Sequence, residues 1–227
     1  MSEENALVLS NNLPVSKYQS DEQLAALTTT SSFLPRIQLF GSQSEMVQSG
    51  KIPMGHWGLV RNADSVEDLG DEVNCWPIRW RYKAMRLGDQ IMAVYNPNNP
   101  EFAKIVSESN VPGQQGALAG LEFLLYLPDI DVFATYHMAN TSARREAPNL
   151  KALIKDDHCI PATLKVTLAK NKKGQKWHAP VVVACKTPID QPDLEANMKV
   201  IENFVNPKES EVQSATKDEA AAANRAR

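Results

Sequence analysis

Residues 75–86 read CWPIRWRYKAMR, and two kinds of side chain alternate along them. Successive side chains of a β-strand point to opposite faces. With that period, one face carries only apolar and aromatic residues, namely Trp76, Ile78, Trp80, Tyr82 and Ala84. The opposite face carries the cations Arg79, Arg81 and Lys83. The alternation therefore predicts a strand with an aromatic ridge backed by a cationic stripe, and Pro77 indicates an edge or a bulge near its start.

Such a strand has two interpretations. Single-stranded nucleic acid is bound by cations that follow its phosphates and by flat rings on which its bases stack, so the segment fits that kind of surface. Alternation more often marks a half-buried strand whose rings lie in the core and whose charges lie in solvent.

Composition limits the class of protein. The chain has 227 residues and a formal net charge of -3, so it lacks the strong positive charge typical of proteins that bind duplex nucleic acid. Its three cysteines show no paired spacing, which favours a reducing compartment. Residues 1–20 lack the pattern of a signal peptide, and the apolar runs are too short to span a membrane. We therefore expect a cytoplasmic protein with no membrane partner.

Three regions differ in composition. Residues 1–32 are rich in Ser, Asn, Gln and Thr, and we expect a flexible N-terminal arm. Residues 206–227 contain no aromatic residue, and we expect a disordered C-terminal tail. The folded, nucleic-acid-binding domain is expected over residues 33–205.

Within that domain most segments have strand patterns. Strands are expected at 33–40, 55–60, 73–86 and 89–95, and in two hairpins formed by 121–127 with 132–138 and by 162–169 with 178–185. Short helices are expected around Phe102, Ile105 and Val106, after a cap at Thr141 or Ser142, and over 192–204. Pro148 would either kink the second of these helices or start a further turn that runs to Ile154. The pattern favours a mainly β fold, an OB-fold-like barrel with short helical additions, and a β-sandwich is the alternative.

The second hairpin is also basic. Lysines crowd its first strand and its tip, next to an aromatic residue: Lys165, Lys170, Lys172, Lys173, Lys176 and Trp177. In OB folds long hairpin loops form walls of the nucleic-acid groove, although lysines at an exposed turn also serve simply as solubilising charges. Arg144 and Arg145, at a predicted helix start, are further candidates for phosphate contacts. Trp57, Tyr82 and Trp177 are our candidates for base stacking.

Catalytic and metal-binding patterns are weak. His158 with Cys159, and His178 with Cys185, match no zinc spacing. Asp129 and Asp131 lie in a short turn, where acids usually serve as turn formers. No nucleophile or phosphate-loop motif appears, so we expect neither a cofactor nor an enzyme.

Four short segments resemble the single-stranded DNA-binding proteins of tailed bacteriophages: LPRIQL at 34–39, GKIPMG at 50–55, WRYK at 80–83 and ATLKV at 162–166. The resemblance covers roughly residues 33–190. It implies an OB fold, non-catalytic coating of replication or recombination intermediates in the host cytoplasm, and partners among replication or recombination proteins. Many members of this class end in an acidic tail with a terminal aromatic residue, whereas this chain ends in Asn-Arg-Ala-Arg.

The sequence thus predicts a protein that binds single-stranded DNA with little sequence preference. Arg79, Arg81, Lys83 and the hairpin lysines would neutralise phosphates, and the three candidate rings would stack bases. Two alternatives come from other classes. One is a virion or assembly protein, and the other is a metal-dependent nuclease that uses Asp129, Asp131 or Glu122.

Overall fold

The computed structural model describes residues 34–42, 44–62, 65–86, 92–111, 116–155 and 158–207. Within these ranges the strands are β1 (Arg36–Leu39), β2 (Trp57–Val60), β3 (Val66–Gly70), β4 (Glu72–Arg86), β5 (Met92–Val94), β6 (Ala117–Leu127), β7 (Val132–Met138), β8 (Ala162–Lys170) and β9 (Lys176–Ala184). The helices are α2 (Glu45–Gln48), α3 (Pro100–Ser109), α4 (Thr141–Ala152) and α5 (Met198–Val205). The predicted N-terminal arm, and all but the first two residues of the predicted tail, lie outside the described residues.

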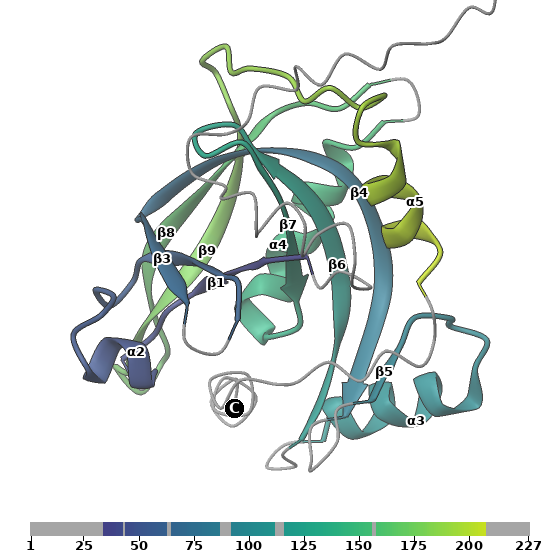
Figure 1. The fold of residues 1–227 in the computed structure, drawn as a ribbon. Helices are drawn as coiled ribbons and strands as arrows, with labels where there is room; N and C mark the ends of the chain where they lie inside the picture. The colour runs from purple at the N-terminus through teal and green to yellow at the C-terminus, as the bar shows by residue number, and fades with distance from the viewer. Residues whose placement is uncertain are drawn as a thin grey trace, which may run out of the picture. The chain divides into compact units, whose positions relative to one another are not determined.

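The strands form one mixed sheet in the order β3-β2-β1-β7-β6-β4-β8-β9, and β5 pairs with β4 (Figure 1). All pairs are antiparallel except β1 with β7. Of the described residues, 43% lie in strands and 21% in helices, so the prediction of a mainly β fold is confirmed. Over the described ranges the sheet does not close, and the predicted OB barrel is therefore not confirmed.

The long strand β4 belongs to both halves of the sheet. Its first four residues pair with β8, and its remaining residues pair with β6. The register with β6 shifts between Pro77 and Arg79, so Ile78 is an extra residue and forms a β-bulge. The position suits proline, whose nitrogen has no hydrogen to donate to the ladder. The predicted bulged entry of this strand is confirmed.

Because of the bulge at Ile78, the prediction that all the aromatic residues of this strand share one face is wrong. One extra residue moves every later side chain to the opposite face. Trp76 and Ile78 pack with Phe204 of α5, whereas Trp80 packs against the main core on the other face. Tyr82 follows Trp80 with a period of two and lies on the same face. The ridge is therefore divided between two sides of the sheet.

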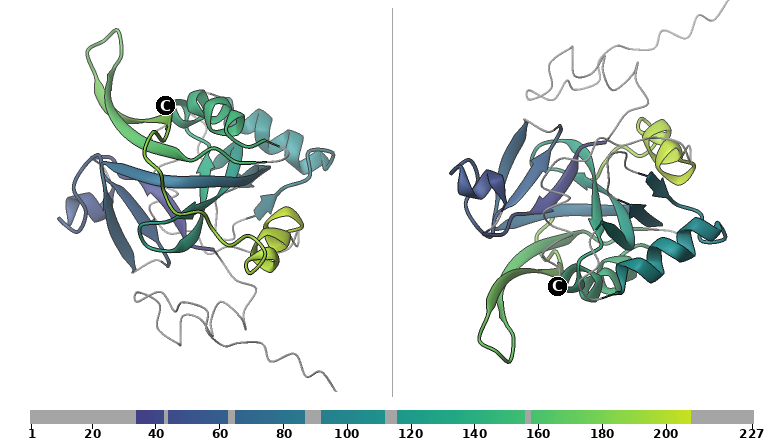
Figure 2. Two further views of the ribbon diagram at one scale, coloured as in Figure 1. Left: turned by 90° about the horizontal axis from the view of Figure 1, so that it is seen from above. Right: turned by 90° about the horizontal axis from the view of Figure 1, so that it is seen from below.

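The main core lies between the curved sheet and α4. It contains side chains of seven strands together with Ala143, Ala147 and Leu150 of the helix. Helix α4 also runs along the edge of β9, where Glu146 Oε2 accepts a hydrogen bond from the backbone N–H of Val182 at 3.0 Å. That contact satisfies an edge group that would otherwise invite pairing with another chain. Helices α3 and α4 lie on one side of β4 and α5 lies on the other (Figure 2).

Both predicted hairpins are confirmed, as β6–β7 and β8–β9. Helix α3 is confirmed, with Asn99 as its N-cap and Pro100 as its first residue. Helix α4 starts after Asn140, one residue before the predicted cap, and it continues through Pro148. Helix α5 begins at Met198, six residues later than predicted. Strand β3 and the single turn α2 were not predicted, because β3 is a polar edge strand without clear alternation.

Within the described residues there is no helix that combines the length and the apolar character needed to cross a lipid bilayer.

Candidate nucleic-acid interface

The predicted cationic stripe of β4 lies against Glu122 of β6, for which the sequence suggested only a role as a nuclease acid. Lys83 is buried, with 4% of its surface exposed, and its Nζ donates to Glu122 Oε1 at 2.7 Å. Arg81 Nε donates to the other oxygen of Glu122, also at 2.7 Å. Burial alone would raise the pKa of Glu122, but the charges of Lys83 and Arg81 outweigh it and lower the pKa to about 2. The carboxylate therefore stays ionised between two cations.

Arg81 also holds α5 in place. Its guanidinium lies between the rings of Tyr95 and Phe204, 3.9 and 4.2 Å from their centroids, and it donates to the Phe204 carbonyl. Arg81 is stacked between two rings and paired with an acid, and its contacts with Phe204 link β4 to α5. Arg79 is exposed, and its Nη1 donates to the carbonyl of Ile78 at 2.9 Å.

These contacts correct the predicted roles of Lys83 and Arg81. A cation that is buried and paired within the chain cannot leave its partner for a phosphate without leaving an uncompensated carboxylate behind. The predicted stripe is thus largely a structural ion cluster. Of its three members, only Arg79 faces solvent.

Trp57 is the second correction. Its ring is fully buried in the main core and meets Tyr136 edge to face, with the centroids 5.3 Å apart. All four residues of β2 are buried, because the strand lies between β1 and β3 and is covered on both faces. The indole therefore presents no free face for a base. A large apolar ring flanked by strand residues is more often core than surface.

Tyr82 is the predicted stacking residue of β4 that does reach solvent, with 45% of its surface exposed. It stands between two other rings in edge-to-face contacts, 5.5 Å from Trp80 and 6.2 Å from Phe102. The ammonium of Lys151, on α4, lies 3.7 Å from the centroid of the Trp80 ring. Phe102 and Lys151 were not predicted for this site, because they come from two helices, α3 and α4, that are separated from β4 in the chain.

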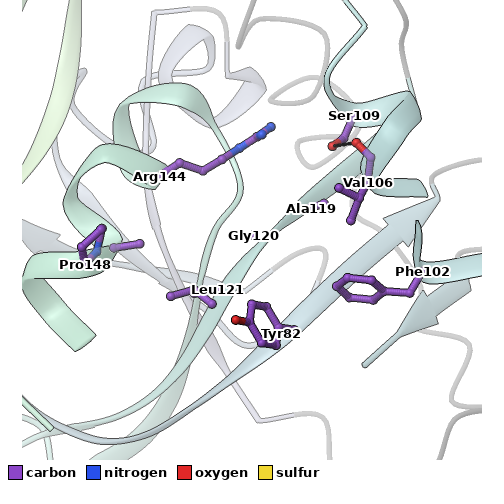
Figure 3. A pocket seen from close by; sticks show the side chains of 10 residues that line it. Tyr82, Phe102, Val106, Ser109, Ala119, Gly120, Leu121, Arg144 and Pro148 are labelled. Atoms are coloured by element: carbon purple, nitrogen blue, oxygen red, sulfur yellow. Dashed lines mark hydrogen bonds between the residues drawn. The ribbon is translucent and has the colours of Figure 1, made fainter. Parts of the chain in front are cut away.

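A pocket opens beside this row of rings (Figure 3). Its volume is about 350 Å³, and it lies between α3 and α4 over the ribbon of β4 and β6. Its lining is almost entirely apolar: Tyr82, Phe102, Val106, Ser109, Ala119, Gly120, Leu121, Arg144, Ala147 and Pro148. Arg144 reaches over one end, where its Nε donates to the Ala139 carbonyl and its Nη1 to Asn110 Oδ1 at 2.9 Å.

The β8–β9 hairpin carries the predicted lysines in the open. All four lysines near its tip are exposed: Lys170, Lys172, Lys173 and Lys176. The turn is well defined, since Asn171 Oδ1 accepts from the backbone N–H groups of Lys173 and Gln175, and Gly174 has a φ of 83°. Lys165, further along the hairpin, pairs with Glu72 at 2.6 Å.

Helix α4 connects the hairpin to the pocket. Trp177 is partly exposed, and its indole Nε1–H donates to Ser142 Oγ at 2.9 Å. Two residues later on the same helical turn, Arg144 lines the pocket, and Arg145 beside it is exposed. The structure thus connects the hairpin lysines and Trp177, through Ser142, to the helix that carries the two arginines, and Arg144 lines the same pocket as Tyr82. It separates them from Trp57 and from the Lys83–Glu122 cluster.

The acids proposed for a nuclease lie apart. Glu122 is held by Lys83 and Arg81, whereas Asp131 Oδ1 accepts from the hydroxyl of Tyr126 at 2.8 Å. Glu122 and Tyr126 are four residues apart on one extended strand, which corresponds to about 13 Å. Among the described residues, no three histidine, cysteine or acidic side chains are grouped as metal ligands.

The chain was compared with known proteins at three levels. No protein-family model matches it, and there is no match among the curated proteins or among the solved structures.

Proposed function

We propose that this chain binds single-stranded DNA with little sequence preference, as the resemblance to tailed-phage proteins implies. One observation carries the proposal. The lysine-rich hairpin tip, with an exposed tryptophan, is fixed through Trp177 and Ser142 to the helical turn that also lines the aromatic pocket. Cations that could contact phosphates and rings that could stack bases therefore lie on elements that contact each other, which supports binding to single strands.

The electrostatics of the hairpin favour this reading. Its tip carries four exposed lysines within seven residues, although the chain as a whole has a formal net charge of -3. A local cationic patch attracts phosphate irrespective of net charge. If all four lysines contact phosphates, the logarithm of affinity should fall with the logarithm of salt concentration with a slope of about -3.

The OB assignment belongs to the same proposal. Strands β4, β6 and β7, then α4, then β8 and β9 follow the chain order of an OB fold, in which a helix separates the third strand from the fourth. The first strand of this set pairs with both the second and the fourth, as β4 does with β6 and β8. Strand β1 adds in parallel to β7, at the position where such a barrel would close. In this frame the basic hairpin is the loop between strands four and five, which commonly contacts nucleic acid.

A role in assembly is the second candidate, and a specific observation favours it. Apolar side chains are exposed on the hairpin at Leu168 and Val183, and on α5 at Met198 and Val205. Exposed apolar side chains of this kind would become buried if the chain associated with another protein. Sedimentation velocity without DNA separates the two functions, since an assembly protein should form large oligomers by itself.

The direct test is a titration of fluorescent oligo-dT and of a matched duplex at two salt concentrations. We expect tighter binding of the single strand, weakened by salt. Lys172→Glu should weaken binding severalfold, whereas Lys199→Glu, the same charge change on the exposed side of α5, should not. Equal affinity for duplex and single strand, or no binding to either, would refute the proposed function.

A further inference from the structure

We propose that the pocket between α3 and α4 receives one base of the bound strand. The inference rests on the proposed function and adds a specific contact to it. Nonspecific stacking needs only an exposed ring, but here the exposed ring of Tyr82 forms one wall of a cavity. Phe102 and Leu121 form further walls, and the backbone of β6 contributes to the lining at Gly120.

The size and shape of the pocket suit a base. Its volume of about 350 Å³ is at the lower end of the range for small-molecule sites. Tyr82 and Phe102 meet edge to face at an interplanar angle of 80°, so the two rings present walls of different orientation. A flat heterocycle can stack on one of these rings and pack its edge against the other. Two rings in this arrangement suit a flat aromatic ligand such as a nucleobase.

The charge at the rim favours a base that arrives on a phosphate chain. Arg144 has five N–H donors, and its hydrogen bonds to Ala139 and Asn110 use two of them. The other three have no hydrogen-bond partner among the described residues. A guanidinium held in place by two contacts can bind a phosphate oxygen or a base carbonyl with little further loss of entropy.

The path into the pocket is also basic. Lys151 lies over the Trp80 ring near the C-terminal end of α4, and Arg145 is exposed in the N-terminal half of the same helix. A strand that runs from the hairpin tip along α4 would thus keep its phosphates near cations while one base turns towards Tyr82. An apolar partner would gain nothing from these charges.

The test fills the pocket without touching the cations. Val106, on α3, lines the pocket, and Val106→Phe should occupy the space of the base. Ser107→Phe adds the same kind of ring to the same helix at an exposed position outside the lining and is the matched control. Tyr82→Ala, at a site that is about half exposed, is a second variant that removes the wall. Thermal unfolding should show that each variant folds.

Each variant is titrated with oligo-dT and with an abasic oligonucleotide of the same length. We expect Val106→Phe and Tyr82→Ala to lose roughly 5- to 150-fold in affinity for oligo-dT, the effect of one stacked base, and to bind the abasic chain unchanged. Ser107→Phe should bind both as the wild-type chain does.

The outcomes separate the two proposals. If both pocket variants bind oligo-dT as the wild-type chain does, the base pocket is refuted and DNA binding stands. If the wild-type chain shows no preference for oligo-dT over duplex, the proposed function fails and the base pocket fails with it. If Val106→Phe abolishes self-association in sedimentation and leaves DNA affinity unchanged, the occupant is a second copy of the chain and the base assignment is wrong.

Discussion

The change Glu122→Gln should destabilise the fold strongly. It keeps the size and shape of the side chain but removes the negative charge that pairs with Lys83 and Arg81. Glu122 has 1% of its surface exposed, and the ammonium of Lys83 beside it is nearly as buried. Breaking a buried pair by removing one partner costs about 3–5 kcal/mol, since the other charge stays in the interior. The lowered pKa of Glu122 gives a similar figure. The difference between 4.5 and about 2 corresponds to roughly 3 kcal/mol.

Urea unfolding at pH 7 measures the effect, and the chain supplies its own control. Glu72 and Lys165 form an ion pair at 2.6 Å across β4 and β8, with 53% and 43% of their side chains exposed. An exposed pair of this kind contributes at most about 1 kcal/mol. Glu72→Gln should therefore change the free energy of unfolding by less than about 1 kcal/mol. The two ion pairs have nearly the same length, 2.7 and 2.6 Å, and each has one partner on β4.

A second substitution should restore the stability that Glu122→Gln loses. Adding Lys83→Met to Glu122→Gln removes the buried ammonium together with its counterion, and most of the lost stability should return. If Glu122→Gln unfolds at the same urea concentration as Glu72→Gln, burial does not decide the strength of these pairs, and the structural role given to the cluster is wrong. If the double variant is no more stable than Glu122→Gln, the loss arises from something other than the unpaired lysine.

Two further predictions concern other parts of the fold. Gly120→Ala places a Cβ 2.3 Å from the Met138 carbonyl oxygen and should cost about 1–3 kcal/mol, whereas Gly41→Ala, with nothing within 4 Å, should stay within about 0.5 kcal/mol of the wild-type chain in urea unfolding. Burial and the charge of Lys83 lower the pKa of His137 to about 3, so between pH 3 and 6.5 the unfolded chain binds more protons, and stability should fall with falling pH by at most about 1.4 kcal/mol per pH unit. Replacing His137 by Gln should flatten urea midpoints measured between pH 7 and 5, and an unchanged slope would contradict the assignment.

Local patterns in the sequence predicted most of the strands. Alternation located β4, and turn residues located the hairpins β6–β7 and β8–β9, because these elements depend on neighbours in the chain. The faces of β4 could not be predicted so well. After the bulge at Ile78, side chains of the same parity point to the opposite face of the sheet. An alternating sequence pattern does not reveal such a change of face.

The candidate site divides in the same way. The exposed lysines of the hairpin and Trp177 could be predicted because a turn is solvent-exposed whatever the rest of the fold does. The buried state of Lys83 could not, since it depends on Glu122, which lies 39 residues away in the chain. The pocket depends on α3 and α4 meeting over one ribbon, and no short segment contains that information.

The cations of β4 are paired within the fold, whereas those of the hairpin tip are exposed, and one physical requirement explains the difference. A cation can bind phosphate only if it keeps its charge near the surface without a competing carboxylate, because a buried charge needs a partner of its own. Lys83 and Arg81 meet that need with Glu122 and so stabilise the fold. The lysines at the hairpin tip project away from the sheet and stay hydrated, which suits reversible contacts with phosphate. The search for DNA contacts should therefore start at the hairpin and at the helical turn that holds Trp177, rather than at the strand whose sequence first pointed to nucleic acid.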